Sequence, residues 1–280
     1  MNRSHLIRHP GPPTTPRRHV VPGAAAPFEF VLGDGEIFLA AVAAAMEAAG
    51  CDSAVIRLDG LVIGPYNYVM PDRSPDDQHA AWYSKTHSGK KAVLDRGTAI
   101  VGRRDGAWFL HCHAIWDDEE RGRCAGHLLP DQVTIAASYS GTGYAFTGGC
   151  FDVTADAETN FSFFRPKKLA ETGKVNAAIV SLAPHEDLST SVSELTEDLG
   201  LGNTDIMGIG SLIGADFTGA PSMDSPISEV LLLGGARRNS GDTPHLPTFC
   251  VDPEGNFFEG DIVPGGAPVC VTFELILVAE

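Results

Sequence analysis

Three histidines stand where they could share one metal ion. His111 and His113 lie two residues apart in an apolar run, and His127 follows a glycine at the start of the next apolar stretch. Because alternate residues of a β-strand point to the same face, both imidazoles of the pair can reach a single ion, with Phe109 beside them. The opposite face is predicted to carry Leu110, Cys112 and Ala114. A turn through residues 117–126 can return the chain so that His127 lies across the pair.

Three neutral imidazoles with an open position form a common site for Zn²⁺, and such an ion lowers the pKa of a bound water toward 7. The same donors accept Ni²⁺, Co²⁺ or Fe²⁺, so the expected cofactor is Zn²⁺ or another divalent transition metal. The alternative is that His111 and His113 are half-buried histidines paired with carbonyl groups. Spacing leaves both interpretations open, and the third histidine favours the metal.

Two glutamates in the predicted turn before His127 are candidates for proton transfer. Glu119 or Glu120 could act as general base on a water at the metal. A charged hairpin tip that is simply solvated is the alternative.

An insert at residues 71–95, rich in Asp, Ser, His and Lys, has no counterpart in the second half of the chain. Inserted loops of this length are often functional. Tyr83, Lys85 and His87 are its candidates for binding a small anionic ligand, as part of a lid that supplies cationic contacts. A surface loop or a subunit contact would explain the same composition.

The elements around these residues recur in the second half. Gly200 repeats Gly50 at an offset of 150 positions, and residues 240–270 repeat residues 106–136 at an offset of 134. In this register His245 falls on His111, Pro247 on His113, and Asp261 on His127, a set that makes a poor metal site. The second copy is expected to serve mainly in packing, with Asp261 as a residue that could contribute to a weaker site.

Each copy shows a strand, a helix, a strand, a long connection and several further strands. Residues 40–49 are strong helix formers closed by Gly50, and residues 54–63 and 132–139 are rich in β-branched side chains. The pattern predicts an α+β fold of two modules, each a mostly antiparallel sheet or two-sheet barrel with one packed helix. The predicted boundaries are a flexible N-terminal arm at 1–27, a first module at 28–150, a linker at 151–175 and a second, degenerate module at 176–280.

Composition restricts the class of partner. The 36 acidic and 20 basic residues give a formal net charge of −16, which repels phosphate backbones and disfavours nucleic acid and membrane surfaces as partners. No apolar run reaches about 18 residues and no secretion signal stands at the N-terminus, so neither membrane insertion nor secretion is expected. The six cysteines form no C-x-x-C pair, which fits a reducing cytoplasm.

Three motifs of the first copy resemble the PPC domain family (plants and prokaryotes conserved domain, also called DUF296 or PCC): Leu32-Gly-Asp-Gly-Glu36, Phe109-Leu-His-Cys-His113 and Ala125-Gly-His127-Leu-Leu-Pro130. Plant members of this family bind AT-rich DNA through an Arg-Gly-Arg-Pro hook. That hook is absent here, since Arg121-Gly-Arg123 is followed by Cys124. Prokaryotic members of the family form trimers of a single domain. The resemblance therefore implies that this tandem chain is a homo-oligomer with threefold symmetry.

These observations favour a metal-dependent enzyme of small-molecule metabolism, of hydrolase, hydratase or lyase type. One alternative is a DNA-binding, transcription-related PPC protein with a structural metal. Another is a noncatalytic oligomeric scaffold that binds a ligand, because a shared fold does not imply a shared chemistry.

Overall fold

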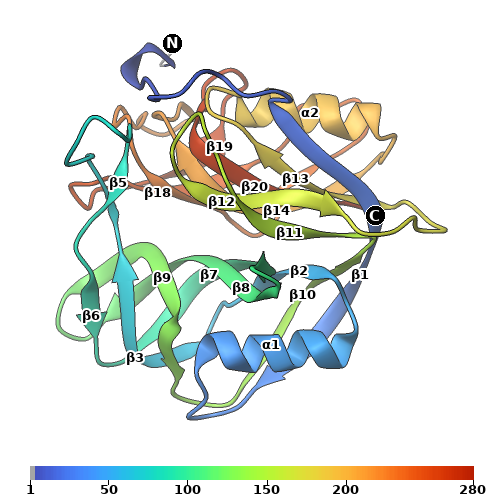
Figure 1. The fold of residues 1–280 in the computed structure, drawn as a ribbon. Coiled ribbons are helices and arrows are strands. Elements are labelled where there is room, and N and C mark those ends of the chain that lie inside the picture. The colour runs from blue at the N-terminus through green and yellow to red at the C-terminus, as the bar shows by residue number, and fades with distance from the viewer. Residues whose placement is uncertain (1–3) are drawn as a thin grey trace.

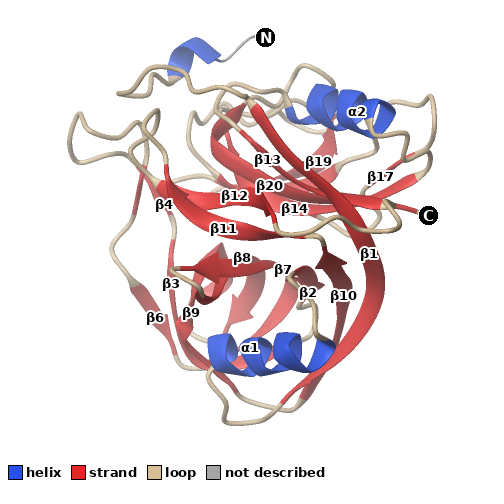
Figure 2. Cartoon of the chain, turned by 45° about the vertical axis from the view of Figure 1, so that its right-hand side comes forward, coloured by secondary structure: helices blue, strands red, loops and turns tan. Residues whose placement is uncertain are grey.

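The structure, a computed structural model, describes residues 4–280. The chain forms four layers, in which a helix covers the outer face of each of two β-sheets and the two sheets pack against each other (Figure 1, Figure 2). The helices are α1 (Phe38–Ala49), α2 (Leu188–Asp198) and a short 3₁₀ helix, η1 (Ser4–Leu6). No helix in the described part of the chain has the length and apolarity needed to cross a membrane.

The first sheet lies against α1. Its strands follow the order β1 (Arg18–Leu32), β10 (Tyr139–Thr147), β2 (Ser53–Arg57), β7 (Ala92–Arg104), β8 (Ala107–Asp118), β9 (Gly122–Ile135) and β3 (Val62–Val69). Because β3 also pairs with the beginning of β7, the last four strands close on themselves. The insert adds β6 (His87–Gly89) beside β3 and a separate ribbon of β4 (Pro71–Asp72) and β5 (Trp82–Tyr83).

The second sheet lies against α2. Its strands follow the order β1, β13 (Ala177–Leu182), β20 (Val269–Ala279), β14 (Thr204–Leu212), β16 (Glu229–Leu232), β18 (Pro247–Val251), β19 (Phe257–Ile262) and β15 (Phe217–Thr218). The short β17 (Arg237–Arg238) pairs with the start of β14. All of these pairings are antiparallel.

Both helices have local sequence signals at their ends. The alanine-rich α1 has high helix propensity and ends at Gly50, whose φ of 61° is a left-handed conformation that glycine adopts without strain. The less helix-prone α2 begins at Asp187, whose side chain accepts a hydrogen bond from the Thr190 amide at 2.9 Å.

Strand β1 belongs to both sheets. Residues 18–23 pair with β13, and residues 24–32 pair with β10. Between the sheets lies a buried core to which both halves contribute, including Val55, Ile100, Ile115, Ile209, Leu231 and Ile276. A shared strand and a shared core therefore fix how the two sheets face each other.

The predicted α+β fold, with one helix on a mostly antiparallel sheet in each half, is confirmed. The predicted arm at 1–27 and linker at 151–175 are wrong in part. Residues 18–27 form part of β1, because residues 18–23 pair with the edge of β13 and residues 24–27 pair with β10. The linker contains a hairpin of β11 (Gly149–Ala155) and β12 (Ser162–Lys168). Residues 1–3 of the predicted arm lie outside the described residues.

All six cysteines are buried free thiols.

Candidate metal centre

Strand β8 sends alternate side chains to opposite faces of the first sheet. The core under α1 receives Leu110, Cys112 and Ala114. Ile115 points the other way, into the core between the sheets. His111 and His113 share the face of Ile115, so the alternation predicted from the sequence places them toward the second sheet.

His127 lies directly opposite His113 in the ladder between β8 and β9. The preceding Gly126 has a φ of 153°, and a Cβ there would stand 2.6 Å from the carbonyl oxygen of Val69, so glycine permits the close approach of β9 to β3. The ring centroid of His127 lies 4.8 Å from that of His111 and 5.5 Å from that of His113. The β8–β9 hairpin thus brings the three predicted histidines together.

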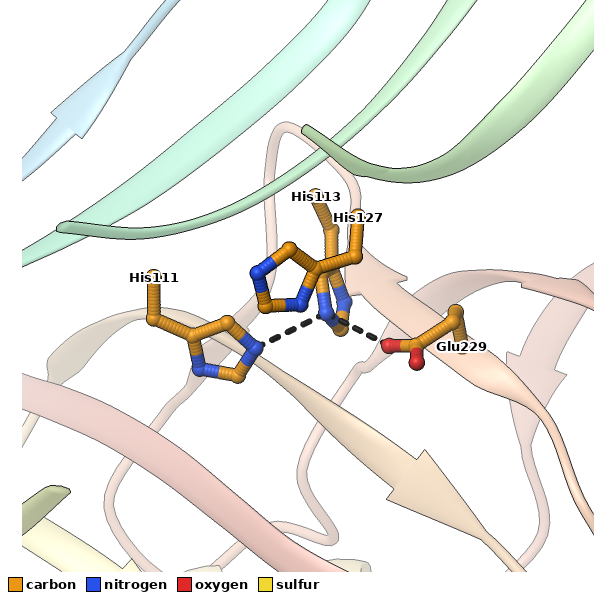
Figure 3. Close-up of side chains that lie close together, drawn as sticks. All are labelled: His111, His113, His127 and Glu229. Atoms are coloured by element: carbon orange, nitrogen blue, oxygen red, sulfur yellow. Dashed lines mark hydrogen bonds and ion pairs between the residues drawn. The ribbon is translucent and has the colours of Figure 1, made fainter. Parts of the chain in front are cut away.

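Glu229, on β16 of the second sheet, completes a cluster of four side chains that we call the His/Glu cluster (His111, His113, His127 and Glu229; Figure 3). One ligand atom from each residue lies within 4.8 Å of the others. His113 Nε2 is 2.5 Å from Glu229 Oε2 and 2.9 Å from His111 Nε2. Imidazole nitrogens and a carboxylate at such separations could hold a divalent metal ion.

Two further contacts orient the rings. His111 Nδ1 lies 2.8 Å from Glu274 Oε2, and His113 Nδ1 lies 2.9 Å from the carbonyl oxygen of Val230. Because a carbonyl only accepts, Nδ1 of His113 donates, and Nε2 of the neutral ring is left with a lone pair that faces the cluster. Outer contacts of this kind orient the histidines of metal sites.

The lone pair of His113 Nε2 faces an acceptor oxygen of Glu229, and two acceptors at this distance repel each other. A proton on Nε2 or a cation shared by the two atoms removes the repulsion. Without a cation, burial lowers the pKa of His113, but its acceptor and acidic neighbours, Glu229 first among them, together raise it more, so the net shift is upward. Burial raises the pKa of Glu229, but the three histidines together lower it more, so its net shift is downward. The donor set therefore fits a positively charged partner.

The other imidazoles are held neutral. Burial and the neighbouring His113 lower the pKa of His111 to about 3, and burial and the other two histidines lower that of His127. Nδ1 of His127 is buried and has no hydrogen-bond partner among the described residues. Burial raises the pKa of Glu274 to about 8. Neutral imidazoles, one of them with an unpaired buried nitrogen, are the form that binds a metal.

Glu229 and Glu274 are the residues that sequence reasoning missed. The second module was expected to serve mainly in packing, and this expectation is wrong because it contributes both carboxyl groups. Each glutamate is the single acidic residue of an apolar segment, at residues 227–233 and 271–278. A buried acidic side chain requires a partner, so this pattern was a usable signal. The partner itself lies on the other sheet.

Glu119 and Glu120 do not belong to the site. They follow Asp118, the last residue of β8, which lies roughly 17 Å of extended strand beyond His113. Both are exposed, and Glu120 pairs with Lys90 at 2.6 Å. The structure therefore does not bring these two predicted residues to the cluster and places them at an exposed hairpin tip.

The predicted ligand-binding residues of the insert divide into two groups. The ring centroid of Tyr83 lies 5.5 Å from that of His127, and Tyr83 lines the cavity described below. Lys85 is exposed and His87 stacks on Tyr68, with ring centroids 5.1 Å apart, and neither lines that cavity.

The second copy has no equivalent of the cluster. His245 and Asp261 form an ion pair with a separation of 3.2 Å, and Asp261 also accepts a hydrogen bond from the Leu246 amide. Across residues 4–280, the His/Glu cluster is the one group of three or more such side chains close enough to share an ion. The expectation that Asp261 could contribute to a weaker site is not met.

A cavity of about 610 Å³ borders the His/Glu cluster, and His111, His127 and Glu229 form part of its wall. Residues of both sheets and of the insert line it. Cavities of this size bind small organic molecules. The aromatic residues of its lining are Trp82, Tyr83, Phe109, Phe161, Phe163 and Phe164.

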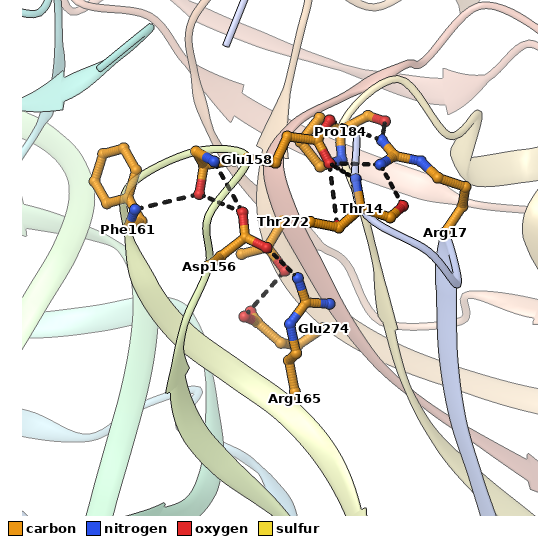
Figure 4. Close-up of polar contacts among 10 residues, drawn as sticks. Thr14, Arg17, Asp156, Glu158, Phe161, Arg165, Pro184, Thr272 and Glu274 are labelled. Atoms are coloured by element: carbon orange, nitrogen blue, oxygen red, sulfur yellow. Dashed lines mark hydrogen bonds and ion pairs between the residues drawn. The ribbon is translucent and has the colours of Figure 1, made fainter. Parts of the chain in front are cut away.

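The N-terminal segment, residues 4–17, packs behind one wall of this cavity. Ile7 is buried in a small core with Ala81, Ile213, Ile227 and Cys270, of which all but Ile213 line the cavity. Glu158, whose side chain is 2% exposed, holds the segment (Figure 4). It accepts hydrogen bonds from the Thr14 amide at 2.9 Å and from the Arg17 guanidinium at 2.5 Å.

No model of a protein family and no curated protein matches this chain. The solved structures similar to it include a PPC protein. This plant- and prokaryote-conserved protein from Pyrococcus horikoshii has 16% identity and a TM-score of 0.39, with 56% of this chain and 100% of that protein covered. A metal-containing protein from Archaeoglobus fulgidus has 16% identity and a TM-score of 0.39, with 51% and 94% covered. A protein from Ralstonia eutropha, provisionally named DNA-binding, has 15% identity and a TM-score of 0.36, with 53% and 95% covered.

Metal content tests the cluster. Protein purified without chelator is expected to carry one transition-metal ion per chain, and His113→Ala, which removes a central donor, is expected to carry none. Glu274→Gln keeps the shape of the side chain but replaces the carboxyl group that orients His111 with an amide, so Zn²⁺ should bind about 10–100-fold more weakly. Elemental analysis and competition with a chromophoric chelator measure both effects.

His245→Ala is the matched control for these variants, because His245 falls on His111 in the repeat yet lies outside the cluster. Its metal content should equal that of the wild type. If the folded His113→Ala variant carried as much metal as the wild type, the assignment of the His/Glu cluster as the metal site would be contradicted.

Release of the N-terminal segment is expected in Glu158→Gln. Burial raises the pKa of Glu158, but the hydrogen bonds from Arg17 and Thr14 lower it more. A depressed pKa means that the anchor stabilises the fold above the ordinary carboxyl pKa and is lost as pH falls through the folded-state pKa. At neutral pH the substitution should cost about 1–3 kcal/mol of unfolding free energy. Trypsin should then cleave after Arg8 and Arg17 faster.

Glu171→Gln is the control for this measurement, because Glu171 is 87% exposed and pairs with Lys168 at the surface. It should leave the cleavage rate unchanged. A wild-type cleavage rate in Glu158→Gln would show that the anchor is not the main restraint on the segment.

Proposed function

We propose that this protein is a metal-dependent enzyme that acts on a small organic molecule, by hydrolase, hydratase or lyase chemistry. The observation that carries the proposal is the position of the His/Glu cluster in the wall of a cavity of about 610 Å³. A structural metal site is closed by its protein ligands, whereas a catalytic site keeps access for a further ligand. Three of the four members of the cluster line this cavity.

The residues of the chain have distinct parts in this proposal. His111, His113 and His127 would hold Zn²⁺ or a similar divalent ion, while Glu274 and the Val230 carbonyl orient two of the rings. When bound, such an ion polarises a carbonyl group or lowers the pKa of a water.

Glu229 contacts His113 and also lines the cavity. It can therefore complete the metal site or accept a proton from the molecule in the cavity. The aromatic side chains of the lining surround a bound molecule with apolar surface, and electrostatic contacts are stronger in such surroundings than in water.

Turnover of a panel of lactones, keto acids and hydroxy acids tests this function. The zinc-loaded protein should convert at least one member, and chelation or His113→Ala should lower the rate on the order of 100-fold or more, because the group that stabilises the transition state is lost. His245→Ala should retain the wild-type rate. Product formation is followed by chromatography.

Other outcomes would replace the proposal with one of its alternatives. Thermal stabilisation by panel members without turnover would indicate a ligand-binding scaffold. If the folded, metal-bound protein binds duplex DNA in a salt-sensitive manner and turns over no panel member, it would be a DNA-binding protein with a structural metal.

A further inference from the structure

We infer that the molecule bound in the cavity is a monocarboxylate with an apolar, ring-sized body, and that Arg104 holds its carboxylate. The inference rests on the proposed function, because it names the class of molecule that the same cavity takes. It depends on two features, which are the apolar character of the walls and one cation without an acidic partner.

The walls of the cavity are mainly apolar. Besides the aromatic side chains, Leu39, Val69, Leu129, Val153 and Ile227 line it. Trp82 and Phe161 lie 5.3 Å apart between ring centroids, and Tyr83 and Phe161 lie 6.1 Å apart, so three rings gather on one side. Such a lining gains free energy by covering an apolar or aromatic body and offers little to a strongly polar one.

Among the described residues, Arg104 is the one basic side chain of the lining besides the histidines. It ends β7 on the face that Ile100 presents to the core between the sheets. Its guanidinium carbon lies 3.5 Å from the ring centroid of Phe109, two residues before His111 on β8. Stacking on a ring fixes the plane of a guanidinium and leaves its N–H edge free.

Arg104 is an exposed residue that forms no ion pair within residues 4–280, although the chain has 36 acidic residues. Asp131 and Glu229 also line the cavity, but neither pairs with it. A stacked guanidinium matches a carboxylate through two parallel hydrogen bonds. One such cation balances a single negative charge, which favours a monocarboxylate over a phosphate monoester.

The neighbouring Arg103 provides a matched comparison. Its guanidinium also stacks on a ring, that of Trp108 at 3.3 Å, but strand alternation turns it to the α1 side. There it lies 3.9 Å from Glu47 of α1, and it does not line the cavity. A substitution of Arg103 therefore removes a stacked positive charge at the end of β7 without changing the cavity, whereas a substitution of Arg104 removes the charge that lines the cavity.

Binding of benzoate, phenylacetate and 3-phenylpropanoate to the zinc-loaded chain, measured by calorimetry, tests the inference. Phenylacetamide serves as the neutral analogue and phenyl phosphate as the dianionic one. Arg104→Met should weaken binding of the acids about 10–100-fold, the loss expected for charge-assisted hydrogen bonds. Arg103→Met should bind them as the wild type does. Arg104→Lys should give an intermediate loss, because lysine keeps the charge without the planar fork.

Three results would overturn the inference: equal affinity of Arg104→Met and wild type for the acids, equal affinity of the wild type for phenylacetamide and phenylacetate, or no binding of any acid by the folded protein. Tighter binding of phenyl phosphate would overturn the choice of a carboxylate. Metal content separates this inference from the proposed function. Acid binding that depends on Arg104 in a chain that holds no metal would leave the inference standing and remove the enzyme proposal.

Discussion

The buried contact between His113 and Glu229 is the interaction on which the candidate site depends. It joins β8 of the first sheet to β16 of the second, at a depth where His113 is 3% exposed and Glu229 is 10% exposed. A carboxylate and an imidazole removed from water each lose several kcal/mol of hydration, which only a partner charge, a hydrogen bond or a metal can offset. The two groups therefore stabilise each other only while the sheets keep their present spacing.

That spacing has two physical causes. Strand β1 is hydrogen-bonded to β13 over one part of its length and to β10 over the other, so neither sheet can slide without breaking a ladder. The apolar core between the sheets adds a packed layer that resists changes in separation. Packed sheets lie about 10 Å apart, which is the span that an imidazole from one side and a glutamate from the other can bridge.

The two sheets divide the residues of the candidate site between them. The first supplies the imidazoles, and the second supplies the carboxyl groups and the Val230 carbonyl that orient them. His245, Pro247 and Asp261 stand at the positions that correspond to the three histidines in the repeat. The second sheet still contributes to the candidate site, because β16 carries Glu229 and β20 carries Glu274. The cavity follows the same division, since its walls come from both sheets and from the insert.

The local geometry of this protein could be predicted from its residues alone. The two-residue period of a strand put His111 and His113 on one face, the hairpin through β8 and β9 returned His127 to them, and the alanine-rich run ending at Gly50 formed α1. These features depend on residues close together in the chain, where backbone geometry allows few arrangements. Three further features depend on how the two sheets pack. Glu229 and Glu274 complete the candidate site, and Arg104, not Lys85, lines the cavity. Glu119 and Glu120 lie far from the cluster. Those outcomes follow from how two sheets pack across a shared strand, and contacts between segments so distant in sequence are set by the burial of whole faces and not by local spacing.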